Sequence, residues 1–316
     1  MYTSDSLHLA EAFQVPVVFM VFNRPGTTQR VFDTIAAARP AKLLLIADGP
    51  RQNKEGEAEA CRQVRDIVSH VDWPCEVFTN FAEDNLGCQE RIISGLNWVF
   101  SLVEEAIILE DDCLPDSSFF PFCEELLKKY KDDRRIAYIC GSNLVERYGS
   151  TADSYFFSRL GGIWGWATWR SEWQRYDRYL SGWPQMKARR SLAEIFDEPR
   201  VVDYWTSIFD AMYEDRGPDT WDHQWFFTNL SNNSLTIVPK TNLIANIGFG
   251  DDATHTTEID ERFILSASSM EFPLKHPSDL IPRRSLDRPR VLDMLPPSFL
   301  KSIPRKIRRV RDRLFR

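Results

Sequence analysis

The chain has 316 residues, of which 43% are hydrophobic, and carries 39 Lys and Arg against 46 Asp and Glu. A sizeable apolar core is therefore available, which excludes a wholly disordered protein, and the net charge of −7 argues against general nucleic-acid binding. Residues 301–316 alone have a net charge of +7, so the other 300 residues have a net charge of −14. We expect an acidic body with a basic end.

Targeting signals and cysteine usage favour a cytoplasmic protein. The first fifteen residues contain no Lys or Arg and no apolar run typical of a signal peptide. The longest apolar run, residues 15–22, is too short to span a bilayer. The six cysteines are spaced irregularly and form no Cys-x-x-Cys pair, which favours reduced thiols.

Buried strands and helices alternate along the first half of the chain. We expect strands at about 15–22, 42–47, 76–80 and 105–109, and helices at about 27–38, 55–69 and 85–102. A further strand is expected at 235–239. Continuous apolar strands separated by helices are typical of a parallel sheet covered on both faces. The sequence thus predicts an α/β fold with a mostly parallel sheet flanked by helices.

Polar residues follow three of these strands. They are Asn23 and Arg24 after the first, Asp48 after the second, and Glu110, Asp111 and Asp112 after the fourth. Ligands of open parallel sheets bind beyond the carboxyl ends of the strands, so we expect these side chains on one rim. The alternative is that each is an ordinary turn residue.

The acidic triplet predicts a metal–phosphate site. Adjacent carboxylates repel one another unless a cation joins them, and hard oxygen ligands suit Mg²⁺ or Mn²⁺ with substrate phosphates completing the shell. The alternative is an acidic turn in which Asp112 caps the following helix. The sequence contains no Gly-x-Gly-x-x-Gly, Walker-type or Gly-x-Ser-x-Gly motif and no paired histidines. These absences disfavour a dinucleotide dehydrogenase, a P-loop kinase, a serine hydrolase and a zinc site.

The second half is rich in tryptophan. Five of the ten tryptophans lie within residues 155–183, interleaved with glycines that would let a ligand approach the backbone. We expect Trp164 and Trp166 to form a wall for a sugar acceptor, against the alternative of an aromatic core. Asp222, between Trp221 and Trp225, suits deprotonation of a hydroxyl, although it could equally begin a helix. His223 and His255, each taken alone, are more simply ordinary histidines.

Several motifs occur in order over about residues 15–256. They are the strand end at Asn23-Arg24, the segment 107–122 around Glu110-Asp111-Asp112, the Gly/Trp segment 156–166, the segment 221–225, and the loop 246–255. With these motifs the chain resembles nucleotide-sugar glycosyltransferases of the GT-A fold, in particular the inverting N-acetylglucosaminyltransferase I type.

The resemblance implies roles for individual residues. Asn23 and Arg24 would bind the nucleotide, and Asp48 would read the uracil edge. Asp112 would ligate Mn²⁺ or Mg²⁺ directly, while Glu110 and Asp111 would serve the ribose, the donor sugar or the waters of the metal. Through the closing loop, His255 would contribute to the metal or the diphosphate.

One motif departs from the family pattern. The family's Trp-Asp-Asp-Trp is Trp221-Asp222-His223-Gln224-Trp225 here, with one extra residue before the second tryptophan. Because a carboxylate usually deprotonates an attacking alcohol, we take Asp222 as the base and keep His223 as the alternative.

The predicted activity is metal-dependent, inverting transfer of a sugar from a nucleotide-sugar, with UDP as the first choice, to a hydroxyl of a glycan or lipid-linked acceptor. The alternatives are a sugar-1-phosphate nucleotidyltransferase of the same fold and a non-catalytic glycan-binding module. We expect the catalytic domain to span residues 1–257, with a nucleotide-binding half at about 15–115 and an acceptor half at about 116–257. Residues 258–316 would form a C-terminal extension.

The basic end predicts a peripheral membrane contact. Ile307, Val310, Leu314 and Phe315 share a rough helical stripe within residues 301–316. A basic amphipathic helix of this kind lies on anionic membranes, here the inner face, and would suit an enzyme with a lipid-linked acceptor. The alternative is a solvated basic end.

Overall fold

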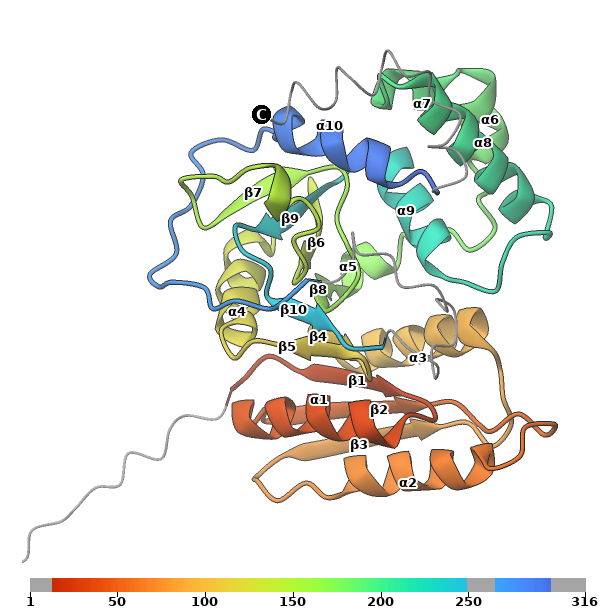
Figure 1. Ribbon diagram of the computed structural model, residues 1–316, viewed down its shortest axis with the longest axis vertical. Helices are drawn as coiled ribbons and strands as arrows, with labels where there is room; N and C mark the ends of the chain where they lie inside the picture. Colours follow the sequence, from red (N-terminus) through yellow and green to blue (C-terminus); the bar gives the residue numbers. More distant parts are fainter. Residues whose placement is uncertain (1–12, 249–264, 297–316) are drawn as a thin grey trace, which may run out of the picture.

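An eight-stranded mixed sheet is the centre of the computed structural model, which describes residues 13–248 and 265–296 (Figure 1). The strand order is β3-β2-β1-β4-β8-β6-β9-β7, and four of the seven neighbouring pairs are parallel. The strands are β1 (Val17–Val21), β2 (Lys42–Ala47), β3 (Glu76–Phe81), β4 (Glu105–Glu110), β6 (Ile136–Cys140), β7 (Tyr155–Ser158), β8 (Trp166–Trp169) and β9 (Leu235–Pro239). The predicted α/β class with a mostly parallel sheet flanked by helices is confirmed.

Alternate side chains of the central strands enter two separate cores. In β1, Val17, Phe19 and Val21 pack toward one face of the sheet, and Val18 and Met20 pack toward the other. The first face is covered by α1 (Pro25–Ala38), α2 (Glu57–Ser69) and α4 (Phe119–Tyr130), and the second by α3 (Cys88–Leu102). Because both faces are covered, β1, β2 and β4 are continuous apolar runs, as predicted.

The strand register brings the predicted polar residues to one edge. Val21 lies opposite Ala47 in β2, and Met20 lies opposite Glu110 in β4. The residues that follow these positions therefore leave the sheet at the same level.

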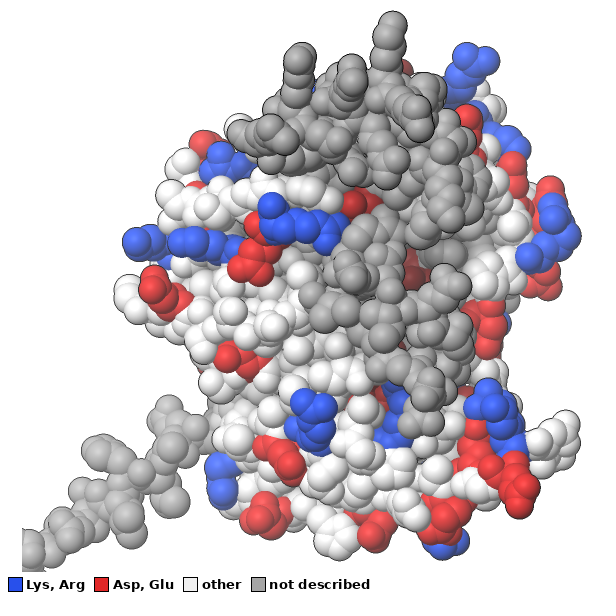
Figure 2. All heavy atoms as spheres, viewed as in Figure 1, with Lys and Arg blue, Asp and Glu red and all other residues white. Residues whose placement is uncertain are grey.

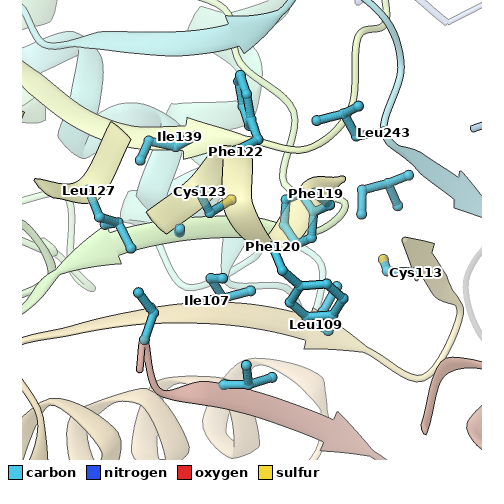
Figure 3. Packing of buried hydrophobic residues seen from close by; sticks show 14 of the residues in the cluster. Ile107, Leu109, Cys113, Phe119, Phe120, Phe122, Cys123, Leu127, Ile139 and Leu243 are labelled. Carbon is cyan, nitrogen blue, oxygen red and sulfur yellow. The ribbon is translucent and has the colours of Figure 1, made fainter. Parts of the chain in front are cut away.

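An aromatic helix anchors the strand that ends in the acidic triplet. In Figure 3, Phe119 and Phe120 of α4 lie on the side of the helix that faces Leu109 of β4, and both belong to one apolar cluster with Phe122 and with Ile107 of β4. All five side chains are at most 3% exposed. Tight packing on this face fixes the carboxyl end of β4, because cores of this density resist small displacements.

The second half contributes short helices and a small two-stranded sheet. The helices are α5 (Arg170–Trp173), α6 (Trp183–Ala188), α7 (Ser191–Ile195), α8 (Pro199–Tyr213), α9 (Asp222–Ser231) and α10 (Arg284–Asp293), and η1 (Glu146–Tyr148) is a 3₁₀ turn. The strands β5 (Cys113–Pro115) and β10 (Ile244–Asn246) pair antiparallel beside the end of β4. Helices α6 to α9 surround a third apolar cluster, which lies toward one end of the molecule in Figure 1.

Most of the tryptophan-rich segment forms core. Trp166 is fully buried, and its ring lies 5.5 Å from that of Trp221 and 5.7 Å from that of Trp225, centroid to centroid. The prediction that Trp166 belongs to an acceptor wall is therefore wrong, because no part of the ring reaches solvent. Its strand, β8, runs antiparallel between β4 and β6, which turns the ring into the face covered by α3 and α9.

The glycines of this segment serve internal packing. A Cβ atom on Gly161 would lie 2.5 Å from Cys140 Sγ. Gly165 has φ +57°, and a Cβ atom there would lie 2.5 Å from Ile244 Cδ1. These two positions need glycine because protein atoms approach the backbone, so the expected approach of a ligand is wrong for them.

The structure also bears on the predictions about cysteines, membrane spans and surface charge. All six cysteines lie within the described residues, and each is a free thiol. Among the described helices, none is long and apolar enough to cross a membrane. On the face shown in Figure 2, basic and acidic side chains lie side by side, so neither sign dominates it. His255 and the basic segment 301–316 lie outside the described residues.

Replacing Trp166 by alanine tests its place in the core. We expect Trp166→Ala to lower the free energy of unfolding by about 3–5 kcal/mol, because a large cavity would remain in a packed cluster. Tyr179, which is 74% exposed, provides the control, and Tyr179→Ala should change stability by less than about 0.5 kcal/mol. Urea denaturation followed by circular dichroism measures both, and equal losses would contradict the assignment.

Candidate active site

A cavity of about 580 Å³ opens at the carboxyl ends of β1, β2 and β4. It extends to the start of α3, to the loop before α9 and to the end of β10. Its polar lining comprises Arg24, Asp48, Arg51, Asn85, Arg91, Glu110, Asp111, Asp112, Asp219, Thr220, Asp222 and Asn246. Apolar walls come from Met20, Ile46, Ile92, Ile163, Trp164 and Trp221, among others. Cavities of this volume accommodate small-molecule ligands and cofactors.

Arg24 bridges two carboxylates of the acidic triplet. Its Nη2 donates to Asp111 Oδ1 and, over 3.0 Å, to Asp112 Oδ2. The side chain of Asp111 is only 4% exposed, and its second oxygen, Oδ2, has no hydrogen-bond partner among the described residues. Arg24 therefore offsets part of a negative charge that extends over three consecutive residues.

Burial and mutual repulsion raise pKa values within the acidic triplet. Burial, together with the charges of Asp112 and Asp111, raises the pKa of Glu110 to about 8. Burial also raises the pKa of Asp111 to about 6, although Arg24 opposes this shift. Burial lowers the pKa of Arg24, but the attraction of Asp111 and Asp112 outweighs it, and the net change is upward. One arginine thus leaves excess negative charge in the cavity, which a divalent cation would relieve.

The residues present fit a divalent cation. Two carboxylates completed by substrate phosphates and water are the usual set for Mg²⁺, and Asp111 Oδ2 is a buried acceptor without a donor. Gly248 lies against this group, where a Cβ atom would collide with Asp112 Oδ2 and lie 2.7 Å from Arg24 Nη1. Among the described residues, however, no group of three or more His, Cys, Asp or Glu side chains is arranged so that it could hold a metal ion by itself.

Asp48 lines the cavity, but both of its carboxylate oxygens already accept hydrogen bonds from other residues of the chain. Its Oδ1 accepts from the amides of Gly49 and Leu86, both at 2.9 Å. Its Oδ2 accepts from Asn85 Nδ2 at 3.0 Å and from the amide of Gly87 at 3.2 Å. A carboxylate has about four acceptor positions, so none remains for a nucleobase unless one of these bonds is replaced. Asp48 shapes the loop before α3.

Arg91 is a buried cation that forms no ion pair with any carboxylate of residues 13–248 and 265–296. It is 7% exposed, and its Nη2 donates to Asn80 Oδ1 at 2.9 Å. Within the described part of the chain, no acceptor reaches its Nε. Burial lowers the pKa of Arg91, and the attraction of Asp48 only partly opposes this. Buried donors without acceptors are costly, so a ligand with acceptor atoms would be favoured beside Arg91.

Asp222 reaches the same cavity from the second half of the chain. It is the first residue of α9, as the alternative of a helix start anticipated. Its Oδ1 accepts from Thr220 Oγ1 and, at 2.9 Å, from the amide of His223. Among the described residues, no donor reaches Asp222 Oδ2. The charge of Asp222 contributes to the raised pKa of Glu110, which places the two carboxylates within electrostatic reach.

Three predicted site residues lie elsewhere. Asn23 donates to Glu57 Oε1 at 2.9 Å and does not line the cavity. His223 also faces away from it, since its ring packs edge-on against Trp205 with centroids 5.5 Å apart. Trp166 is buried, as described above, whereas Trp164 is half-buried and does line the cavity.

Sequence reasoning missed Arg91 and Asp219. Arg91 had a signal, because it is a charged residue that directly precedes the buried Ile92 and Ile93 of α3. The sequence signal for Asp219 was weaker. It is that α3 begins after Gly87, which has no side chain to cap the helix. A helix start of this kind indicates that the cap comes from another part of the chain, but not from which part.

No family model matches the chain, and no curated protein is significantly similar to it. Three solved structures illustrate what the fold is similar to. CMP:2-keto-3-deoxy-manno-octonic acid synthetase complexed with CTP is 15% identical over 52% of this chain and 78% of its own, with a TM-score of 0.33. UDP-glucose pyrophosphorylase complexed with UDP-glucose is 9% identical over 72% of this chain and 90% of its own, with a TM-score of 0.35. The 4-diphosphocytidyl-2C-methyl-D-erythritolsynthase from Anaerococcus prevotii DSM 20548 is 10% identical over 53% of this chain and 77% of its own, with a TM-score of 0.32. The fold follows from the strand order of the chain itself and not from these similarities.

The raised pKa of Glu110 predicts how stability depends on pH. Between the ordinary value of 4.5 and about 8, the folded state binds more protons than the unfolded state, so stability falls as pH rises through this window. Each pH unit costs up to about 1.4 kcal/mol for one group. Urea unfolding with a chelator at about pH 5.5 and about pH 7.5 should show this loss, and Glu110→Gln should show much less of it. An equal loss in both proteins would contradict the assignment.

Proposed function

We propose that the chain is a divalent-metal-dependent glycosyltransferase that moves a sugar from a nucleoside-diphosphate sugar to an acceptor hydroxyl. The observation that carries this proposal is that Asp222, from the second half of the chain, lines the same cavity as Glu110, Asp111 and Asp112 at the strand ends. Carboxylates suited to hold a cation thus share one cavity with a carboxylate suited to accept a proton.

The metal would be Mn²⁺ or Mg²⁺, held by Asp112 with Asp111 beside it. When bound, it would neutralise charge on the leaving diphosphate. The role that the resemblance gives His255 stays a proposal, because that residue lies outside the described part of the chain. Arg24, beside both aspartates, would face the phosphates or the nucleoside.

Asp222 would act as the base. Both hydrogen bonds that it accepts go to Oδ1, so Oδ2 is the oxygen open to an acceptor hydroxyl. Removal of the hydroxyl proton by Asp222 makes the oxygen nucleophilic as it attacks the anomeric carbon from the face opposite the leaving group, which inverts the configuration. His223 is the weaker candidate because it does not line the cavity.

Trp164 and Ile163 provide the apolar surface on which an acceptor sugar would stack. The acceptor would be a glycan or a lipid-linked saccharide. A membrane contact through residues 301–316 would suit the latter, and those residues lie outside the described part of the chain.

A second candidate, nucleotidyl transfer to a sugar phosphate, is favoured by one observation. Arg24 at the end of β1 lies beside Asp111 and Asp112, where a basic residue and a cation could together face a nucleoside triphosphate. The turn after β1 weakens this candidate, because Pro25 opens α1 directly and leaves no glycine-rich loop to cradle phosphates.

The nucleobase would be uracil, and we propose that Arg91 rather than Asp48 distinguishes it. Uracil carries a keto oxygen where cytosine carries an amino group, and a guanidinium only donates. Arg91→Leu should therefore weaken UDP binding by about 10-fold or more and bring the affinities for UDP and CDP together. Titration calorimetry measures both ligands, with Arg170→Leu, remote from the cavity, as the control. An unchanged preference for UDP would contradict this role.

The catalytic proposal is tested by binding and turnover together. A thermal-shift screen of UDP, GDP, CDP and ADP with and without Mn²⁺ identifies the nucleotide, because a bound ligand stabilises the folded state. Transfer from the matching nucleotide-sugar is then compared with pyrophosphate release from the nucleoside triphosphate and a sugar 1-phosphate. Pyrophosphate release alone would establish the second candidate, and glycan binding without turnover would indicate a binding module.

Two variants assign the roles of the carboxylates. Asp222→Asn should lower kcat by about 10²-fold or more while UDP affinity stays nearly unchanged, because the base acts only in the chemical step. Asp112→Ala should abolish Mn²⁺-dependent turnover of the nucleotide-sugar. A loss confined to donor affinity in Asp222→Asn would move the base elsewhere, and near-normal turnover in Asp112→Ala would refute the metal role.

A further inference from the structure

Two carboxylates from opposite halves of the chain hold the start of α3. The amides of Leu86 and Gly87 donate to Asp48, at the end of β2. The next two amides, of Cys88 and Gln89, donate to Asp219 Oδ2 and Oδ1, both at 2.9 Å. The first amides of a helix have no partner within the helix, and Gly87 has no side chain to supply one. Asp219 supplies that cap from 131 residues further along the chain.

The same segment is connected to Asp222. Gln89 Nε2 donates to the carbonyl oxygen of Thr220 at 2.7 Å. Thr220 Oγ1 in turn donates to Asp222 Oδ1. Thr220 therefore connects the first turn of α3, through its carbonyl oxygen, with the carboxylate proposed as the base, through its hydroxyl.

Asp219 packs closely against Gly87 at the start of α3. Gly87 has φ +82°, and a Cβ atom there would lie 2.8 Å from Asp219 Oδ2. Glycine is needed both for the backbone conformation and for the approach of the carboxylate. The positive end of the helix dipole stabilises the charge of Asp219. Asp219 lines the cavity, but each of its oxygens accepts an amide hydrogen bond that fixes the position of its carboxylate.

We propose that Asp219 is a positioning residue, which fixes the loop before α9 so that Asp222 faces the sugar held by the other half of the chain. This inference rests on the proposed glycosyl transfer. Positioning is demanding, since a displacement of about 1 Å can cost about 10²-fold in rate. Asp219 is thus required for turnover without being needed to bind the nucleotide.

The test compares Asp219→Ala and Asp219→Asn with the full-length wild type. Asp219→Ala should lower kcat by about 10²-fold and leave the Kd for UDP with Mn²⁺ nearly unchanged. Asp219→Asn keeps one acceptor oxygen and should lose less. The control is Asp177→Ala, which removes another carboxylate that accepts loop amides, from Tyr179 and Gly182, outside the cavity. It should leave kcat unchanged.

Hydrogen exchange supplies a readout that does not depend on turnover. In Asp219→Ala, the amides of Cys88 and Gln89 should exchange faster, while those of the core strand β1 stay protected. Circular dichroism confirms that each variant is folded at the assay temperature, so that lost activity is not lost protein. Unchanged exchange at Cys88 and Gln89 would overturn the proposal, because the cap would then not exist in solution.

The outcomes separate this proposal from the one on which it rests. If the wild type transfers sugar and Asp219→Ala keeps a normal kcat, only the role of Asp219 is refuted. If the wild type transfers no sugar from any nucleoside-diphosphate sugar, the proposed function fails and the role of Asp219 fails with it. A kcat loss with intact UDP binding and fast exchange at Cys88 supports both.

Discussion

The structure of the cavity depends on how negative charge at the end of β4 is compensated. Three consecutive carboxylates leave a buried strand together, and repulsion between them would destabilise that strand end without a cation. Arg24 compensates part of this charge because β1 and β4 are parallel neighbours, so that their carboxyl ends lie side by side. The compensation is incomplete, since Glu110 still has a strongly raised pKa. This remaining imbalance is the physical basis for expecting a divalent cation with a phosphate ligand.

A second constraint is that the cavity is shared between the two halves of the chain. The sheet continues from β4 into β8, whose Trp166 is surrounded by the rings of Trp173, Trp221 and Trp225. This aromatic cluster holds the start of α9 next to the sheet, and Asp222 follows Trp221 directly. Most of the tryptophans therefore contribute to the site through packing, whereas Trp164 and Trp221 line the cavity and Trp164 is the more exposed of the two.

On the side of the cavity proposed for the nucleotide, the existing hydrogen bonds of Asp48 and Arg91 distinguish their roles. Asp48 occupies the expected rim, yet four donors from residues 49 and 85–87 already use its oxygens. Arg91, which no motif indicated, is buried with an unpaired Nε. A cavity residue whose capacity is filled organises the wall, whereas one with free capacity is available to a ligand. This distinction requires coordinates, because residue type alone does not reveal it.

The sequence by itself determined the α/β class, the four strands β1 to β4 to within two residues at their ends, and the side of the sheet at which Arg24, Asp48 and the acidic triplet gather. These features are local: apolar runs form covered strands, and parallel strands end at one edge. Only the tertiary structure decided that Trp166 is core, that His223 faces away, and that Asp219 caps a helix 131 residues earlier in the chain. The direction of a side chain and its hydrogen-bond partners depend on strands and helices distant in sequence. No local pattern encodes those contacts.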